Sequence, residues 1–198
     1  MSKILLHSCC APCSAYVIQE LQKEYKVTLF YFNPNIFPKE EYQKRLAEAK
    51  EYCQKIKVDF IEGRFSESNS ETELDSESYK TEHGLWLEKI KGYENEPEKG
   101  KRCEICYKHR LEKTALEAKE LGYDVFCSTL SISPHKDAQM INKIGLELSK
   151  EYGIEYLESD WKKHDGFKKS CDISREEGFY RQEYCGCEFT LLNSIAKR

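Results

Sequence analysis

Seven of the ten cysteines in this chain fall into three short clusters that lie far apart in the sequence. The clusters are Cys9, Cys10 and Cys13 in HSCCAPCS, Cys103 and Cys106 in RCEICYKHR, and Cys185 and Cys187 in YCGC. Thiolates bind iron and zinc, and a pair of thiols exchanges two electrons with a disulfide. Because the clusters come from the start, middle and end of the chain, only the folded protein can combine them. The pattern predicts a metal or redox centre.

The first two clusters have the residue types of a metal site. Cys103 and Cys106 lie one turn apart on an expected helix and so share one of its faces. The adjacent Cys9 and Cys10 cannot comfortably chelate one zinc ion, but they can bind two irons of a cluster. Together these four thiolates are the usual complement of an iron–sulfur cluster or a structural zinc. The zinc alternative would make the protein an RNA- or partner-binding module without catalysis.

The third cluster suggests redox chemistry. In Cys185-Gly186-Cys187 the glycine gives the backbone freedom, so the two sulfurs can close a strained and readily reduced disulfide. A dithiol stores two electrons, whereas an iron–sulfur cluster passes one at a time. A protein with both can accept single electrons and deliver a pair. Cys53 and Cys127 stand alone and are expected to be buried bystanders.

Strand-like and helix-like patterns alternate along the chain. Strands are expected over residues 3–7, 27–32, 58–62, 124–132 and 154–157. Helices are expected from Pro12 onward and over 39–56, 84–90, 103–121, 136–152, 174–182 and 189–196. This alternation predicts a single α/β domain over residues 1–198, with a parallel sheet flanked by helices and an acidic, Ser-rich insert at about 66–82. Ligands bind at the carboxyl ends of such strands, which is where the first cysteine cluster lies.

The charge pattern indicates an anionic substrate. The net charge of −4 gives no general attraction to nucleic acid. However, basic residues crowd two segments, Lys99–Arg110 around the middle cysteines and Lys162–Lys169. No stretch has the apolar length of a secretory signal or a membrane span, so a cytoplasmic location without membrane partners is expected. Thiols stay reduced there, which makes a disulfide framework the less favoured reading.

Five motifs resemble those of the QueH type of epoxyqueuosine reductase: LLHSCCAPCS, YFNPNIFPKEEYQKR, GYENEPEKGKRCEICYKHRLEKTA, STLSISPHKD and DGFKKSCDISREEGFYRQEYCGC. The resemblance extends from Ile4 to Cys187, apart from the acidic insert. It implies the last step of tRNA queuosine biosynthesis, the reduction of epoxyqueuosine to queuosine in the anticodon wobble position, without cobalamin. It also implies an adenine-nucleotide α-hydrolase-like (HUP/Rossmann-like) fold.

The resemblance further implies roles for individual residues. Cys9, Cys10, Cys103 and Cys106 should ligate a 4Fe–4S cluster, and Cys185 with Cys187 should form a redox-active pair. Cys13 should bind a second metal, such as a mononuclear iron, or act near the cluster. The partners would be tRNA containing epoxyqueuosine and an unidentified electron donor. Residues expected to contact the tRNA are Lys101, Arg102, Lys108, Arg110, Lys168 and Lys169.

Two further questions are posed by the motifs. The reaction needs a proton donor, for which His135, His164, Asp165 and Tyr184 are candidates by their motif positions.

An ATP-dependent tRNA thiolase is an alternative enzyme class and would have a related fold. The first loop reads SCCAPCS, however, and lacks the Gly-rich SGGxDS phosphate loop of such enzymes, so the sequence argues against ATP use.

Overall fold

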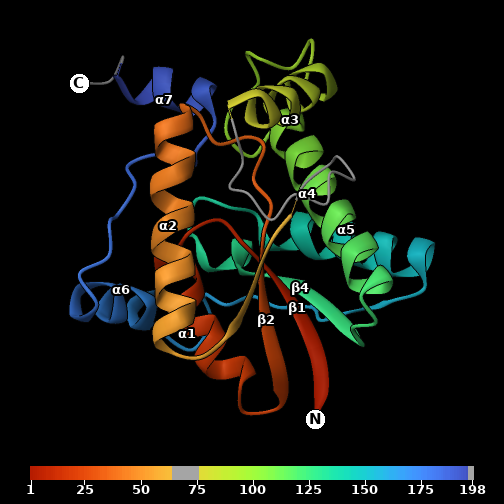
Figure 1. Ribbon diagram of the computed structural model, residues 1–198. Helices are drawn as coiled ribbons and strands as arrows, with labels where there is room; N and C mark the ends of the chain where they lie inside the picture. The colour runs from red at the N-terminus through yellow and green to blue at the C-terminus, as the bar shows by residue number, and fades with distance from the viewer. Residues whose placement is uncertain (64–75, 196–198) are drawn as a thin grey trace.

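The computed structural model describes residues 1–63 and 76–195 (Figure 1). Within them, five strands form one sheet in the order β3-β2-β1-β4-β5, with every pair of neighbours parallel. The strands are β1 (Ser2–Ser8), β2 (Tyr25–Tyr31), β3 (Asp59–Glu62), β4 (Val125–Ser128) and β5 (Glu155–Tyr156). The predicted α/β class is confirmed.

The central strand β1 fixes the position of the first cysteine cluster. Its apolar residues Ile4, Leu5 and Leu6 are fully buried, as expected for a parallel strand covered on both faces. Each such side chain contributes about 1.5–3 kcal/mol through burial. In the register of the sheet, Ser8 lies opposite Tyr31 of β2, and His7 lies opposite Ser128 of β4. The residues that follow Ser8 therefore emerge at the centre of the carboxyl edge of the sheet.

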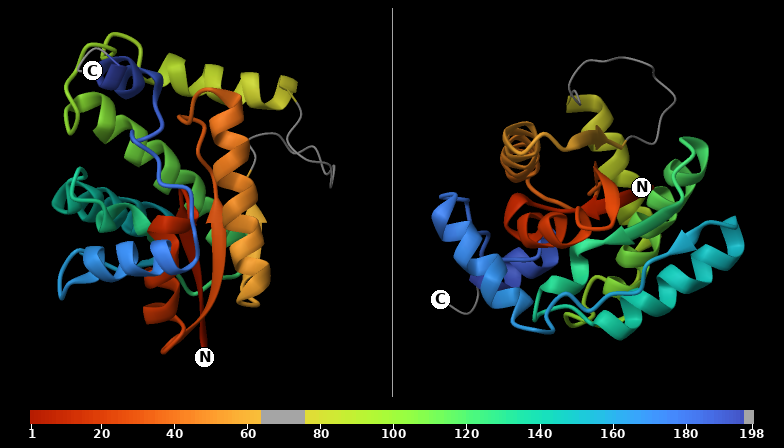
Figure 2. Two further views of the ribbon diagram at one scale, coloured as in Figure 1. Left: turned by 90° about the vertical axis from the view of Figure 1, so that its left-hand side faces the viewer. Right: turned by 90° about the horizontal axis from the view of Figure 1, so that it is seen from below.

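Helices cover both faces of the sheet (Figures 1 and 2). The helices α1 (Ala11–Leu21), α2 (Lys39–Lys55) and α6 (Gly166–Glu176) pack together on one face. On the other face α4 (Lys101–Glu120) packs against α5 (Ala138–Tyr152). The helices α3 (Ser76–Lys89) and α7 (Glu188–Ile195) lie beyond the carboxyl edge of the sheet (Figure 1). Strand order reverses between β1 and β4, and ligands bind at this switch point in such sheets.

Several expected boundaries were wrong. The helix expected at 84–90 begins at Ser76, so residues 76–82 of the acidic insert are helical, whereas residues 66–75 lie outside the described residues. The strand expected at 124–132 ends at Ser128, because the Ser128 hydroxyl accepts a hydrogen bond from the Leu130 amide and starts the 3-10 turn Thr129–Ile132. The helix expected at 174–182 is α6, where Ser170 donates to the Pro12 carbonyl and anchors it on α1.

Two other features bear on the sequence-based expectations. No helix in the described parts of the chain has the length and apolar character needed to cross a bilayer. Cys53 and Cys127 are fully buried in the core, which confirms their expected positions away from the surface.

Candidate active site

The first cysteine cluster forms a sulfur triad at the junction of β1 and α1. Cys10 has extended backbone angles directly before α1, and Pro12 lies in the first helical turn, where its missing N–H costs nothing. The sulfurs of Cys9, Cys10 and Cys13 all lie within 4.8 Å of one another. Among the described residues, this is the one group of three or more metal-ligating side chains so closely spaced. The triad could therefore hold a metal.

Hydrogen bonding concentrates negative charge on one member of the triad. The thiols of Cys10 and Cys13 hold the pKa of Cys9 well below its usual range, and the Lys136 and Arg110 charges act in the same direction against burial. Cys13 alone would lower the pKa of Cys10, but the bond to Cys9 and burial raise that pKa to about 12. Hydrogen bonds to Cys10 and Cys9, together with burial, also raise the pKa of Cys13. Cys9 is thus the favoured thiolate.

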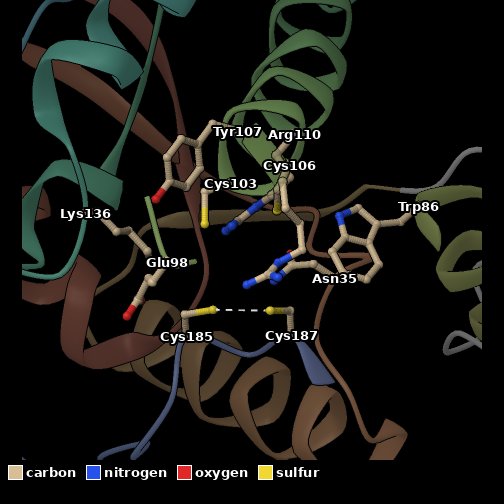
Figure 3. A pocket seen from close by; sticks show the side chains of 11 residues that line it. Asn35, Trp86, Glu98, Cys103, Cys106, Tyr107, Arg110, Lys136, Cys185 and Cys187 are labelled. Carbon is tan, nitrogen blue, oxygen red and sulfur yellow. Dashed lines mark hydrogen bonds between the residues drawn. The ribbon is translucent and has the colours of Figure 1, made fainter. Parts of the chain in front are cut away.

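The second cluster lies at the start of α4. The Glu96 carboxylate accepts the Lys101 amide at 3.0 Å and helps to begin the helix. Cys103 and Cys106 are both buried on its first turns, and the Lys99 amide donates to the Cys103 sulfur at 3.3 Å. Burial raises the pKa of Cys103 to about 11 and also raises that of Cys106. These two side chains point toward Cys185 and Cys187 (Figure 3).

The third cluster lies on the irregular segment between α6 and α7. The Cys185 and Cys187 sulfurs are 3.7 Å apart, and the Thr190 hydroxyl lies 3.1 and 3.3 Å from them. The hydrogen bond with Cys187 lowers the pKa of Cys185 well below its usual range against the effect of burial, with help from Thr190 and Lys136. The bond to Cys185, followed by burial, raises the pKa of Cys187. Cys185 is the favoured thiolate of this pair.

Backbone contacts fix the segment that carries this pair. The Phe37 amide donates to the Gly186 carbonyl at 2.8 Å. The buried Arg45 donates to the carbonyls of Tyr184 and Cys185 at 3.3 and 3.4 Å. The segment also reaches the triad, because the Gln182 amide nitrogen lies 3.1 Å from the Cys10 sulfur. This contact links the segment that carries the third cluster to the triad.

Two adjoining cavities lie between the clusters. Side chains of all four cysteines from the second and third clusters line the small inner cavity, together with Trp86, Tyr107 and Arg110 (Figure 3). The outer cavity has a volume of about 610 Å³ and is lined by Cys13, Cys185, His135, Gln182 and Tyr184, among others. Three residues, Cys185, Glu98 and Lys136, line both. Cys185 is thus the one cysteine in contact with both spaces.

A buried cation, Arg110, lies between the first two clusters. Its guanidinium donates to Asn33 Oδ1 at 2.6 Å and to His7 Nε2 at 3.3 Å. The His7 ring also places Nδ1 2.9 Å from Ser128 Oγ and Nε2 3.2 Å from the Phe32 carbonyl, and burial, followed by the Arg110 charge, lowers its pKa well below the usual range. Burial opposes the charge on Arg110, but interaction with the sulfurs of Cys106 and Cys9 outweighs burial and raises its pKa. Arg110 therefore stabilises negative charge in both clusters.

The basic residues expected to contact tRNA divide into two groups. Lys101, Lys108, Lys168 and Lys169 are exposed. Arg102 and Arg110 are buried, and Arg102 Nη1 donates to the carbonyls of Glu94 and Glu96 at 2.6 Å each. The spacing of Arg102, Cys106 and Arg110 at intervals of four residues was a signal that they share one helix face. Sequence reasoning missed this signal.

The expected proton donors are also divided. His135 and Tyr184 line the outer cavity, whereas His164 and Asp165 lie in the turn before α6 and line neither cavity. The Tyr184 hydroxyl donates to the Phe37 carbonyl. Sequence reasoning missed Lys136, Arg45 and Thr190. For Lys136 the available signal was its place in the STLSISPHKD motif, in the loop between a strand and the next helix.

Comparison with known proteins gives a consistent result. The family model described as "Epoxyqueuosine reductase QueH" matches residues 4–193. Relatives with this name include proteins from Streptococcus pyogenes serotype M1 (39% identical, covering 94% of this chain and 69% of the relative) and Acinetobacter baylyi (40%, covering 97% and 82%). Another is from Thermotoga maritima (34%, covering 100% and 94%).

A solved structure is also similar. It is the crystal structure of a predicted subunit of tRNA methyltransferase from Methanocaldococcus jannaschii, with a TM-score of 0.58 and coverage of 94% of this chain and 95% of that one. At 12% identity the likeness shows the fold alone. It agrees with the adenine-nucleotide α-hydrolase-like fold expected from the sequence.

Proposed function

This chain belongs to the epoxyqueuosine reductase QueH family, and we propose that it is a tRNA-modifying oxidoreductase that reduces epoxyqueuosine to queuosine in the anticodon wobble position. The observation that carries the proposal is the meeting of three cysteine clusters around two cavities that share Cys185. The outer cavity of about 610 Å³ is within the size range of small-molecule sites. Residues 1–198 would act as one catalytic domain.

In this proposal, Cys185 and Cys187 are the redox-active pair. Removal of the epoxide oxygen as water requires two electrons and two protons, and oxidation of a dithiol to a disulfide releases the same number of each. The two sulfurs are 3.7 Å apart, and a bond of about 2.05 Å would need only a small movement. The neighbouring Gly186 supports this movement because it lacks a side chain.

Cys9, Cys10, Cys103 and Cys106 would hold a 4Fe–4S cluster, with Cys13 bound to a second metal or placed near the cluster. The residues fit such a group. Four thiols are available, and Arg110 acts on both Cys9 and Cys106. The buried Nε and Nη2 of Arg102 have no hydrogen-bond partner among the described residues and would suit an anionic, sulfur-rich ligand. When bound, the cluster would supply single electrons from an external donor to restore the dithiol, without cobalamin.

The tRNA would be held by exposed lysines. Four of the expected residues are exposed and can approach anticodon-loop phosphates, namely Lys101, Lys108, Lys168 and Lys169. Arg102 and Arg110 are left out of this set because they are buried and bonded within the protein. A substrate that is part of tRNA, together with a need for reduced thiols, supports a cytoplasmic location.

The proposal is tested with anaerobically purified protein and tRNA that contains epoxyqueuosine. After reduction of the protein, mass spectrometry of the digested tRNA should show queuosine, and metal analysis should show iron and sulfide. Colourless protein that contains stoichiometric zinc and leaves the epoxide unchanged would contradict the proposal. That result would favour the structural-zinc binding module instead.

A further inference from the structure

Lys136 occupies a central place that the sequence did not reveal. It lies in the loop between β4 and α5, at the switch point of the sheet, and is only 9% exposed. Its side chain lines both the inner and the outer cavity, as do Cys185 and Glu98 (Figure 3). A charged group so placed can contact a ligand in the outer cavity and remain close to the redox pair.

The backbone around Lys136 is held on three sides. The Lys136 amide donates to the Ser133 carbonyl at 3.2 Å, and its own carbonyl accepts the Lys162 ammonium at 3.3 Å. The next residue, Asp137, caps α5 by accepting the amides of Gln139 and Met140. The side chain therefore starts from a fixed position, as a preorganised site requires.

The surroundings keep the side chain charged. Burial would lower the pKa of Lys136, but negative charge on the sulfurs of the Cys9 and Cys13 pair outweighs burial and raises it, against the opposing charge of Arg110. Cys185 acts in the same direction, and the Glu98 carboxylate belongs to the same cavity walls. Because the Lys136 side chain lines both cavities, its ammonium can reach a ligand in the outer one.

We propose that Lys136 is a catalytic residue whose ammonium group holds the epoxide oxygen and gives it a proton as the carbon–oxygen bond breaks. This inference rests on the proposed function. The Cys185 thiolate and Cys187 thiol become a disulfide, which releases two electrons and one proton. Lys136 supplies the second proton. Both carbon–oxygen bonds of the epoxide break, the two electrons complete the carbon–carbon double bond, and the oxygen leaves with both protons as water. The neutral amine then regains its proton from water in the outer cavity.

The other proton donors suggested by the motifs fit this role less well. His135 is exposed and lines only the outer cavity. The Tyr184 hydroxyl is committed to the Phe37 carbonyl, and burial raises its pKa to about 12. Lys136 is the donor that shares both cavities with Cys185, the favoured thiolate.

Lys136→Met and Lys136→Arg test the role, with Lys143→Met on the exposed side of α5 as the matched control. Pre-reduced protein in excess is mixed with an anticodon stem–loop RNA that carries epoxyqueuosine, and one turnover is followed by mass spectrometry. Loss of a proton donor should slow Lys136→Met by about 100-fold or more. The guanidinium of Lys136→Arg can donate hydrogen bonds but retains its proton, so this variant should also be slow.

A binding measurement separates catalysis from structure. Lys136→Met should lose affinity for the RNA with the epoxide, yet bind RNA with queuosine as wild type does, because queuosine lacks the epoxide oxygen. Lys136→Arg should restore much of the lost affinity. Lys136→Gln replaces the Met variant if that variant does not fold.

Three results would overturn the inference. They are wild-type turnover by Lys136→Met, full turnover by Lys136→Arg, and equal loss of affinity for both RNAs. If the wild-type protein leaves the epoxide intact, that result would instead contradict the proposed function itself.

Discussion

The sulfur triad and the carboxy-terminal cysteine pair have similar electrostatics but different supports. In each, one thiol has a lowered pKa and its partners have raised values, because the sulfurs hydrogen-bond to one another. Cys9 and Cys10 belong to the main core, between the central strand and α1. Cys187 instead packs in a small separate cluster with Trp86 and Cys106. The same local chemistry is thus built on a rigid base in one case and on an irregular segment in the other.

This difference suits the two roles proposed for them. Residues that hold a metal must keep their sulfurs in place, and an apolar strand–helix junction provides that rigidity. A redox pair must change its sulfur separation as the bond forms and breaks. The segment with Cys185 and Cys187 is held mainly by bonds to its backbone carbonyls, from Arg45 and Phe37, which leave the side chains free to approach each other.

The largest effect is expected from separating the two cysteine roles by mutation. Cys185→Ser should reduce turnover below detection, because the pair loses its favoured thiolate. The protein should nevertheless keep the brown colour of a bound iron–sulfur cluster. Cys103→Ser should lose both turnover and colour. Absorption spectra, iron content and single-turnover assays on the two proteins decide the question. Equal loss of iron in both variants would show that Cys185 is a metal ligand, and the proposed separation between metal ligands and the redox pair would then be wrong.

Removal of Arg45 should weaken the support of the redox pair. Arg45→Met removes the partner that the half-buried Glu41 carboxylate has at 2.7 Å, which leaves that carboxylate its bond from the Tyr180 hydroxyl, and it deprives two backbone carbonyls of their Arg45 donor. The free energy of unfolding, measured in urea, should fall by about 3 kcal/mol or more. Lys55→Met is the control, because it breaks the exposed pair with Glu177 and should cost about 1 kcal/mol or less. Similar losses in the two variants would show that Arg45 has no special role.

Gly186→Ala should have a smaller effect that is specific to the pair. Gly186 has a φ of +118°, and an added Cβ would lie 3.0 Å from Ile36 and 3.2 Å from Arg45. We expect a cost of about 1–3 kcal/mol and slower turnover. Gly153 also has a positive φ, +67°, but an added Cβ would meet nothing within 4 Å. Gly153→Ala should therefore lower stability by about 1–2 kcal/mol and leave turnover unchanged. Slower turnover in the Gly153 variant would argue against a local effect at Gly186.

The two cysteine regions also differ in how well the sequence predicted them. The apolar run Ile4–Leu6 identifies a buried parallel strand, and the cysteines that follow it lie at its carboxyl end as expected. The arrangement around Cys185 has no such pattern, because it depends on loops without periodicity and on the distant Arg45. Likewise, the charge of Arg102 and Arg110 gave no indication of which structure covers that face of α4.

The smallest predicted effect concerns the Thr190 hydroxyl and the pH dependence of Cys185. Because the pKa of Cys185 is lowered, this residue should remain a thiolate as the pH falls below the usual thiol pKa. Its alkylation by iodoacetamide, which requires the thiolate, should therefore stay fast at that pH. Thr190→Val removes the hydroxyl that lies 3.1 Å from the Cys185 sulfur and helps to lower its pKa, so the midpoint of the rate should move upward by about one pH unit or less.

The matched control for this change is Thr114→Val. Both threonine hydroxyls donate to a backbone carbonyl at 2.8 Å, but only that of Thr190 lies beside the two sulfurs. Each hydroxyl has a single proton. If the proton of Thr190 stays on the Cys187 carbonyl, the two variants will show the same alkylation midpoint as wild type. In that case the lowered pKa of Cys185 must depend on Cys187 and Lys136. The Cys185 thiolate would then be stabilised mainly by a sulfur–sulfur hydrogen bond, as the Cys9 thiolate of the triad is.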